Sequence, residues 1–386
     1  MYDVIVVGAG VEGSATAYQL ARRGQKVLLI EQHALPHSRG SSHGESRITR
    51  KAYWHSALYT EMMEKCFQEY EVLEKLTGDK VYVPTGGLFV GTEAMVGKYA
   101  ASMKAHGLPF VSMTADDINS KYSGLLSYPN SFRGLFDPNA GILKADKFLT
   151  ALWKAIVKFG GEIGDEESLL KVVPNMAGGG VRVCTQKNTY SAKKVVLCLG
   201  PWAPKFLTSL GLHLPLQVQL IKVCFWKPKN AASFSRDRFP ILLSQETTEG
   251  HHFYGMSSLE HNGLYKFCLH HGPDTEPDNR DGPDGAGCVQ ACREHIARYL
   301  PGLDPARPCV VDSCMYTMTP DENFILDRHP QFPDIVIGAG FSGHGFKLSP
   351  VVGHILADLA MDRESPYDLS LFRIHRFTTP RISSRI

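Results

Sequence analysis

The sequence lacks both a long apolar run and an excess of one charge. No segment reaches the roughly 20 apolar residues of a membrane-spanning helix, so no membrane span is expected. The 41 Lys and Arg residues are nearly matched by 39 Asp and Glu residues and form no long basic run. This balance argues against a nucleic-acid partner. The 386 residues are 43% hydrophobic, which is enough for the cores of two or three domains.

The nine cysteines are odd in number, scattered and without CxxC spacing. We therefore expect reduced thiols in an intracellular protein, with neither a disulfide framework nor a metal site. A cleaved secretory leader is not expected either. An apolar strand begins at residue 2 and runs into a glycine-rich turn that cleavage would remove.

That turn is the strongest motif of the sequence. The strand Tyr2–Val7 leads into G-x-G-x-x-G, formed by Gly8, Gly10 and Gly13, and the strand after the next helix ends before Glu31. Gly8 permits the tight turn, Gly10 lets the backbone approach a pyrophosphate, and Gly13 lets the helix pack on the strand. Glu31 is expected to accept the ribose hydroxyls. The pattern predicts a dinucleotide site and outweighs the alternative, a merely structural turn.

A second glycine cluster follows another apolar strand near the end of the chain, and Gly340, Gly343 and Gly345 belong to it. No acid lies about twenty residues further on after a strand, so a second nucleotide is not indicated. We predict that the helix N-terminus after this cluster faces the flavin end of FAD, where its dipole stabilises negative charge on the reduced ring. The alternative is an ordinary tight connection between strand and helix.

Because these two units lie at opposite ends of the chain, we predict an α/β protein in which both ends build one cofactor domain. The predicted FAD-binding domain comprises 1–86, 146–217 and 321–386. The segments 87–145 and 218–320 form the inserted substrate domain, and short alternating runs from Leu216 to Tyr316 predict a mostly antiparallel sheet there. A long amphipathic helix is predicted over Ala57–Thr77.

Further ordered motifs span the whole chain. They are His43-Gly44-x-x-Arg47-x-x-Arg50, Gly200-Pro201-Trp202, Lys266-x-x-x-His270, Cys314-Met315-Tyr316-Thr317 and the segment from Gly340 to Lys347. With the first glycine turn, this set resembles the monomeric sarcosine oxidase family, which includes peroxisomal sarcosine and L-pipecolate oxidases. The resemblance implies a glutathione-reductase-like FAD domain with an inserted mixed or antiparallel sheet. It also implies a monomer that oxidises secondary amino acids with O2, yielding an imine and H2O2.

His43, Arg47 and Arg50 are spaced so that one helical turn would place all three on one face. Two arginines on one face repel each other unless an anion lies between them, and a substrate carboxylate or the flavin is a natural candidate. The alternative is pairing with Glu31, Glu45 or other surface acids. The resemblance implies that Arg50 and Lys347 bind the substrate carboxylate. By pattern alone, Lys347 could equally be a solvated lysine.

Cys314 immediately precedes the return of the chain to the cofactor domain. A free buried thiol is the default interpretation of an isolated cysteine. The resemblance instead implies a thioether between Cys314 and the 8α-methyl carbon of the flavin. The remaining cofactor contacts that we predict come from Ser41, Ser42, Arg47, Trp202 and Lys347.

Lys266 and His270 are four residues apart in an expected strand, so both side chains should point into one pocket. A buried lysine beside a flavin would stabilise the negative charge that O2 gains with its first electron. The resemblance assigns this role to Lys266. His270 and Tyr254 are expected on the amine side of the substrate, with Tyr316 lining the same cavity. The alternative is that Tyr254 and His270 are packing residues with satisfied polar tips.

Three other functions stay open on the sequence alone. They are an FAD dehydrogenase that passes electrons to a protein or quinone, an oxidase of other N-alkylated substrates such as glycated amino acids, and a non-enzymatic flavin-binding protein. The final residues, Ser384-Arg385-Ile386, approximate a peroxisomal import signal with Ile in place of Leu. We therefore expect an import receptor as a partner and a peroxisomal location, with the cytoplasm as the alternative.

Overall fold

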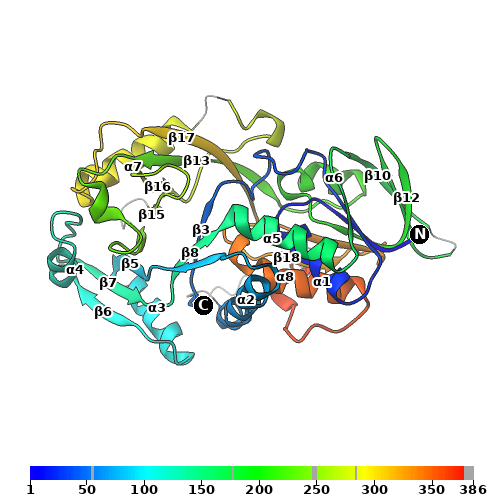
Figure 1. Cartoon of the computed structure of the whole chain (residues 1–386), viewed down its shortest axis with the longest axis horizontal. Coiled ribbons are helices and arrows are strands. Elements are labelled where there is room, and N and C mark those ends of the chain that lie inside the picture. Colours follow the sequence, from blue (N-terminus) through cyan, green and yellow to red (C-terminus); the bar gives the residue numbers. More distant parts are fainter. Residues whose placement is uncertain (54–55, 176–177, 246–249, 283–284, 378–386) are drawn as a thin grey trace, which may run out of the picture.

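The computed structural model describes residues 1–53, 56–175, 178–245, 250–282 and 285–377. Two large β-sheets form two lobes, and a small sheet lies between them (Figure 1). The first lobe contains the chain start and most of the helices, and the second contains the middle of the chain. In the described part, no helix has both the length and the apolar character required to cross a bilayer.

The first sheet contains both glycine-turn strands. Its path is β10-β11-β12-β1-β2-β9, and β19 pairs with β12 and β18. The pairings β1–β2, β1–β12, β2–β9 and β12–β19 are parallel. The strands are β1 (Tyr2–Val7), β2 (Val27–Ile30), β9 (Glu162–Gly164), β10 (Leu169–Pro174), β11 (Val181–Thr185), β12 (Thr189–Leu197), β18 (Ile325–Arg328) and β19 (Ile335–Ala339).

Strand β1 is buried on both faces because its side chains alternate between two cores. Val4 and Val6 pack into a core shared with four helices, whereas Ile5 and Val7 pack into a core on the opposite face. The four helices are α1 (Val11–Arg22), α2 (Ala57–Thr77), α5 (Ala145–Lys158) and α8 (Ser349–Ala360), and the opposite core includes α6 (Ala203–Ser209). The prediction of a helix over Ala57–Thr77 is confirmed.

The second sheet has the order β17-β13-β16-β15-β14-β5-β7-β6 and is antiparallel except for the pair β5–β14. The predicted antiparallel sheet is thus confirmed. Helix α7 (Ala286–Tyr299) lies between its strands β16 and β17 in the sequence and packs against one face of the sheet. The strands are β5 (Gly87–Thr92), β6 (Val111–Thr114), β7 (Phe132–Asp137), β13 (Gln217–Trp226), β14 (Ile241–Gln245), β15 (His252–Ser257), β16 (Tyr265–Leu269) and β17 (Val310–Met318). Helices α3 (Glu93–Ala105) and α4 (Ala115–Lys121) lie at the β5–β7 end.

The small sheet joins β3 (Ser46–Thr49), β8 (Gly141–Lys144) and β4 (Tyr82–Pro84). It corrects one prediction: Arg47 lies in strand β3 and Arg50 directly follows it, so His43, Arg47 and Arg50 do not share a helical turn. Residues three and four apart both lie on one face only when the segment is helical, because side chains alternate between the two faces of a strand.

A second correction concerns the last glycine cluster. Helix α8 begins at Ser349, and a 3-10 turn, η4 (Phe346–Leu348), separates it from Gly345. The sequence pattern predicts Lys347 just inside the helix that follows the cluster, but the structure places it in this turn, before α8 begins. The other 3-10 turns are η1 (Gly200–Trp202), η2 (Ala231–Phe234), η3 (Pro277–Asn279), η5 (Ser370–Phe372) and η6 (Ile374–Phe377).

The strands of the first sheet all fall within 1–86, 146–217 and 321–386. Those of the second sheet fall within 87–145 and 218–320, except that β13 begins at Gln217. The small sheet draws strands from both sets of segments. The division of the chain into two domains at these boundaries stays a proposal.

Candidate active site

A cavity of about 1060 Å³ extends from the first glycine turn to the second sheet. Its wall is drawn from the β1–α1 turn, the segment 35–50, strands β13–β17 and the loop 341–347. Nearly all of the residues predicted from the sequence line it. They are Gly8, Gly10, Glu31, Ser41, Ser42, His43, Arg47, Arg50, Trp202, Tyr254, Lys266, His270, Cys314, Tyr316, Gly343, Gly345 and Lys347. Gly13 and Gly340, predicted as cofactor contacts, are not among the lining residues.

Gly13 and Gly340 have a backbone role, and neighbouring residues line the cavity. A Cβ on Gly13 would come within 1.9 Å of the Gly8 carbonyl oxygen, so only glycine lets helix α1 approach the turn this closely. Gly340 has a φ of +65°, and a Cβ there would lie 2.4 Å from Thr319 Cγ2. Each glycine therefore shapes a loop that other residues present to the cavity.

At the turn after β1, backbone groups and short polar side chains form a cradle. The amide of Val11 donates to Ser42 Oγ at 3.0 Å, and the amide of Ala9 donates to the Glu31 carboxylate at 2.8 Å. Burial acts to raise the pKa of Glu31, but His37 and the backbone donors outweigh it and lower that pKa. Glu31 is therefore an anionic acceptor at the end of β2, where the sequence predicted a ribose contact.

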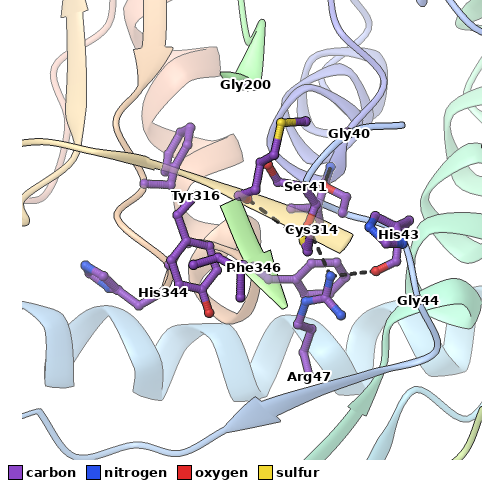
Figure 2. A pocket seen from close by; sticks show the side chains of 18 of the residues that line it. Gly40, Ser41, His43, Gly44, Arg47, Gly200, Cys314, Tyr316, His344 and Phe346 are labelled. Atoms are coloured by element: carbon purple, nitrogen blue, oxygen red, sulfur yellow. Dashed lines mark hydrogen bonds between the residues drawn. The ribbon is translucent and has the colours of Figure 1, made fainter. Parts of the chain in front are cut away.

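The segment 41–47 is organised around the Arg47 guanidinium. Arg47 donates to the carbonyl oxygens of Ser46, Ser41 and His43 at 2.8, 3.1 and 2.6 Å, and it lies 5.4 Å from the centre of the Phe346 ring. Figure 2 shows it between His43 and Phe346, beside Cys314. Within the described ranges no ion pair involves Arg47, so the alternative of pairing with surface acids is wrong for this residue.

Cys314 lies in β17 with 5% of its surface exposed, and its Sγ is 3.7 Å from the Ser41 carbonyl oxygen. His43 faces the same region. Burial, together with the charge of Arg47, lowers the pKa of His43 to about 3, so its imidazole is neutral at physiological pH. Its Nε2 atom is buried and has no hydrogen-bond partner in the described part of the chain.

Two cationic side chains occupy the wall nearest the second glycine loop. The Lys347 ammonium donates to the His344 carbonyl oxygen at 3.1 Å and lies 5.3 Å from the centre of the Tyr53 ring. The Arg50 guanidinium lies 4.6 Å from the same ring and 5.5 Å from that of Tyr99. Burial and the nearby charge of Arg50 lower the pKa of Lys347 well below its ordinary value. An anion near both groups would offset this repulsion.

Across the cavity, His270 Nδ1 lies 3.0 Å from the Tyr316 hydroxyl, and the Tyr254 ring packs edge-on against the imidazole. Burial and the charge of Lys347 lower the pKa of His270 to about 3, so this histidine is also neutral. Gly343 allows the close approach of its loop, since a Cβ there would lie 2.6 Å from Tyr316 Cε2. His270 and both tyrosines therefore present a neutral polar surface to the cavity.

The buried lysine of β16 has an acidic partner that sequence reasoning missed. Lys266 Nζ lies 2.6 Å from Glu260 Oε1 and donates to Ser46 Oγ at 2.8 Å. Burial acts to raise the pKa of Glu260, but the Lys266 ammonium outweighs it and lowers that pKa to about 2. An acid six residues before a lysine predicted to be buried was the available signal, because buried lysines are almost always paired.

The cavity joins a dinucleotide-type glycine turn to a pocket of polar side chains, and comparison with known proteins gives the class of protein to which it belongs. The family described as FAD dependent oxidoreductase (DAO) matches residues 3–359. The chain is 42% identical to peroxisomal sarcosine oxidase of Mus musculus, with 98% of this chain and 97% of the relative covered. It is 35% identical to monomeric sarcosine oxidase of Streptomyces avermitilis, with 96% of each covered. NikD, an amino acid oxidase essential for nikkomycin biosynthesis, superposes with a TM-score of 0.83 at 25% identity over 97% of each chain.

The chain therefore belongs to the FAD dependent oxidoreductase family, and it is a flavin-dependent amine oxidoreductase. The resemblance to the monomeric sarcosine oxidase family is confirmed. The cavity fits FAD on its own evidence as well. It joins the glycine cradle at α1 to the second glycine loop, and an unpartnered buried carboxyl, Glu12, lies between the two loops.

The neutral state of His270 predicts an acid-sensitive fold. The unfolded histidine binds a proton below about pH 6.5, whereas the folded one resists protonation down to about pH 3, so stability falls as pH decreases through this window. Between pH 6.5 and 4.5, His270 should account for up to about 2 kcal/mol of the loss. Urea unfolding of His270→Gln should show a correspondingly weaker pH dependence. His213→Gln, at an exposed position, is the control, and equal pH slopes for wild type and His270→Gln would contradict the assignment.

Proposed function

We propose that the protein oxidises secondary amino acids such as sarcosine and L-pipecolate with O2. The substrate C–N bond loses two electrons and two protons, O2 becomes H2O2, and water hydrolyses the imine. Sarcosine would give glycine and formaldehyde. FAD supplies the two-electron acceptor when it is bound. The relatives named sarcosine oxidases support this substrate class.

The observation that carries the proposal is the pair of cations in the cavity. Arg50 has 6% and Lys347 has 7% of its surface exposed, and Lys347 makes no ion pair within the described ranges. A substrate carboxylate placed against both would relieve their repulsion and accept the bidentate hydrogen bonds that arginine offers. These two residues therefore orient an amino acid by its carboxylate end.

The other end of the substrate would then meet His270, Tyr254 and Tyr316. Only an uncharged amine can release electron density from its α-carbon, so the substrate ammonium group must lose a proton before it reacts. A neutral imidazole does not repel the ammonium form as it enters the cavity. We infer that His270, held by the Tyr316 hydroxyl at 3.0 Å, favours loss of the amine proton.

A substrate panel tests this function. Purified protein should release H2O2 with sarcosine, L-pipecolate, L-proline and other N-methyl amino acids, whereas the matched methyl esters, which lack the carboxylate, should react poorly. A glycated amino acid tests the wider N-alkyl alternative. Reduction of an artificial acceptor without peroxide would instead identify a dehydrogenase, and no turnover with any amine would leave a flavin-binding protein.

We also propose that Cys314 carries the cofactor through a thioether to the 8α-methyl carbon. Forming the C–S bond breaks the S–H bond of the thiol and one C–H bond of the methyl group, which releases two protons and two electrons. O2 finally accepts both electrons and both protons and becomes H2O2. The nearly buried Sγ in the cavity wall, with neutral His43 nearby, supports the assignment. Acid-precipitated wild-type protein should stay yellow, and Cys314→Ser should release its flavin into the supernatant. Cys309→Ser, at an exposed cysteine, is the control. A colourless wild-type pellet would exclude the thioether.

Lys266 is proposed to provide the positive charge that helps O2 accept electrons, and Glu260 to hold that ammonium in place. Lys266→Met should slow reoxidation of the reduced flavin by about 100-fold in stopped-flow traces, because a preorganised charge is lost. Glu260→Gln leaves a buried lysine uncompensated and should lower the free energy of unfolding by about 3 kcal/mol.

The double variant separates these effects. Glu260→Gln/Lys266→Met should recover part of the stability while reoxidation stays slow, because no charge is left unpaired. Wild-type reoxidation in Lys266→Met would remove Lys266 from the oxygen reaction. Additive stability losses in the double variant would show that Glu260 does not act through Lys266.

We further propose a monomer located in the peroxisome. The name of the Mus musculus relative supports the location, and an oxidase that releases H2O2 is safest beside catalase. The import signal proposed at Ser384-Arg385-Ile386 lies outside the described residues. A fluorescent reporter ending in the last dozen residues should enter peroxisomes and should lose that location when Ile386 is deleted. A diffuse signal from both reporters would defeat the proposal.

A further inference from the structure

One acidic residue of the glycine turn has no role in the chemistry described so far. Glu12 is the second residue of helix α1 and lies between Gly10 and Gly13 of the motif. Its surface is 7% exposed, and both carboxyl oxygens are buried without a hydrogen-bond partner among the described residues. A carboxyl group in this state is costly, so its presence at this site indicates a role beyond folding.

The position of the carboxyl group is well defined by its neighbours. A Cβ on Gly345 would lie 2.7 Å from Glu12 Oε1 and equally close to Phe341 Cβ. The acid therefore reaches from the first glycine turn to the second and lines the cavity between them. The phosphate-binding turn and the flavin-end loop meet at this side chain.

The surroundings favour the protonated form. Burial raises the pKa of Glu12 well above its ordinary value, and no cation among the described residues offsets that effect. Pyrophosphate binds at the N-terminus of the helix that follows a G-x-G-x-x-G turn, and helix α1 begins one residue before Glu12. An ionised Glu12 would repel this anion, whereas the neutral acid has an O–H group that can donate to it.

We propose that Glu12 is a neutral acid that donates a hydrogen bond to an oxygen of the pyrophosphate–ribityl chain of FAD. The inference depends on FAD as the cofactor and not on the substrate. It explains why a carboxyl group without a partner among the described residues lies in the wall of the cavity. The bound cofactor would supply the hydrogen-bond acceptor.

Two substitutions separate this role from packing. Glu12→Gln keeps the shape and a donor but has no charge at any pH, whereas Glu12→Leu fills the space without a donor. If Glu12 serves FAD, the leucine variant should lose cofactor affinity while its flavin-free form is at least as stable as the parent. Removing an unpaired buried polar group does not weaken a fold.

The variants are best compared in a Cys314→Ser background, where FAD is held by non-covalent contacts and can be removed and titrated. Fluorescence titration should give Glu12→Gln an FAD dissociation constant within about threefold of the parent. Glu12→Leu should bind FAD about 10-fold or more weakly, the range of one hydrogen bond to a charged group. Thermal unfolding of the flavin-free proteins supplies the stability comparison.

Each contrary result overturns the proposal. Parental FAD affinity in Glu12→Leu would show that no hydrogen bond is made, and equal weakening in Glu12→Gln would show that a carboxylate is required. A destabilised flavin-free Glu12→Leu would indicate packing. Infrared difference spectra of the FAD-loaded parent and Glu12→Gln give a direct check that needs no leucine variant. The parent should show a protonated carboxyl C=O band that the glutamine variant lacks, and carboxylate bands in its place would contradict the neutral acid.

Discussion

The cavity depends on close approaches of main chain that tolerate no Cβ atom. Gly13 packs against the Gly8 carbonyl oxygen, and a Cβ on Gly353 of helix α8 would come within 2.7 Å of the Ala15 backbone in helix α1. These contacts bring the N-terminal ends of α1 and α8 together from opposite ends of the sequence. The two glycine loops consequently face one elongated space. The second sheet closes that space with its polar side chains.

The buried ionisable side chains of the cavity differ in what offsets the cost of their burial. Lys266 is paired with Glu260 and Ser46, so its burial is stabilised by the protein itself. Burial, and after it the nearby charge of Arg50, lowers the pKa of Lys347, and both side chains line the cavity, where an anionic ligand could meet them. His43 and His270 are also buried near positive charges, and both are neutral because their pKa values are lowered. The cavity can therefore attract a carboxylate at one wall and present an uncharged polar surface opposite it.

Much of the fold could be predicted from local pattern. The G-x-G-x-x-G turn with its flanking strands, the helix over Ala57–Thr77 and the antiparallel middle of the chain depend on periodicity and glycine placement. The alternation in β16 also predicted that Lys266 and His270 would enter one cavity, and both line it. Tyr265, Phe267 and Leu269, which alternate with the cavity-facing positions, pack into the opposite core.

The sequence by itself determined the cofactor class, the family and the residue types available to the cavity, because these depend on motifs whose members are close in the chain. The tertiary structure alone decided the conformation of Arg47, which pairs with β8 as part of a strand although its spacing suits a helix. It also decided the partnerships of Lys266 with Glu260 and Ser46, and the isolation of Glu12 between two loops. Ion pairing and desolvation depend on distances between atoms that are remote in sequence, and no local pattern encodes those distances.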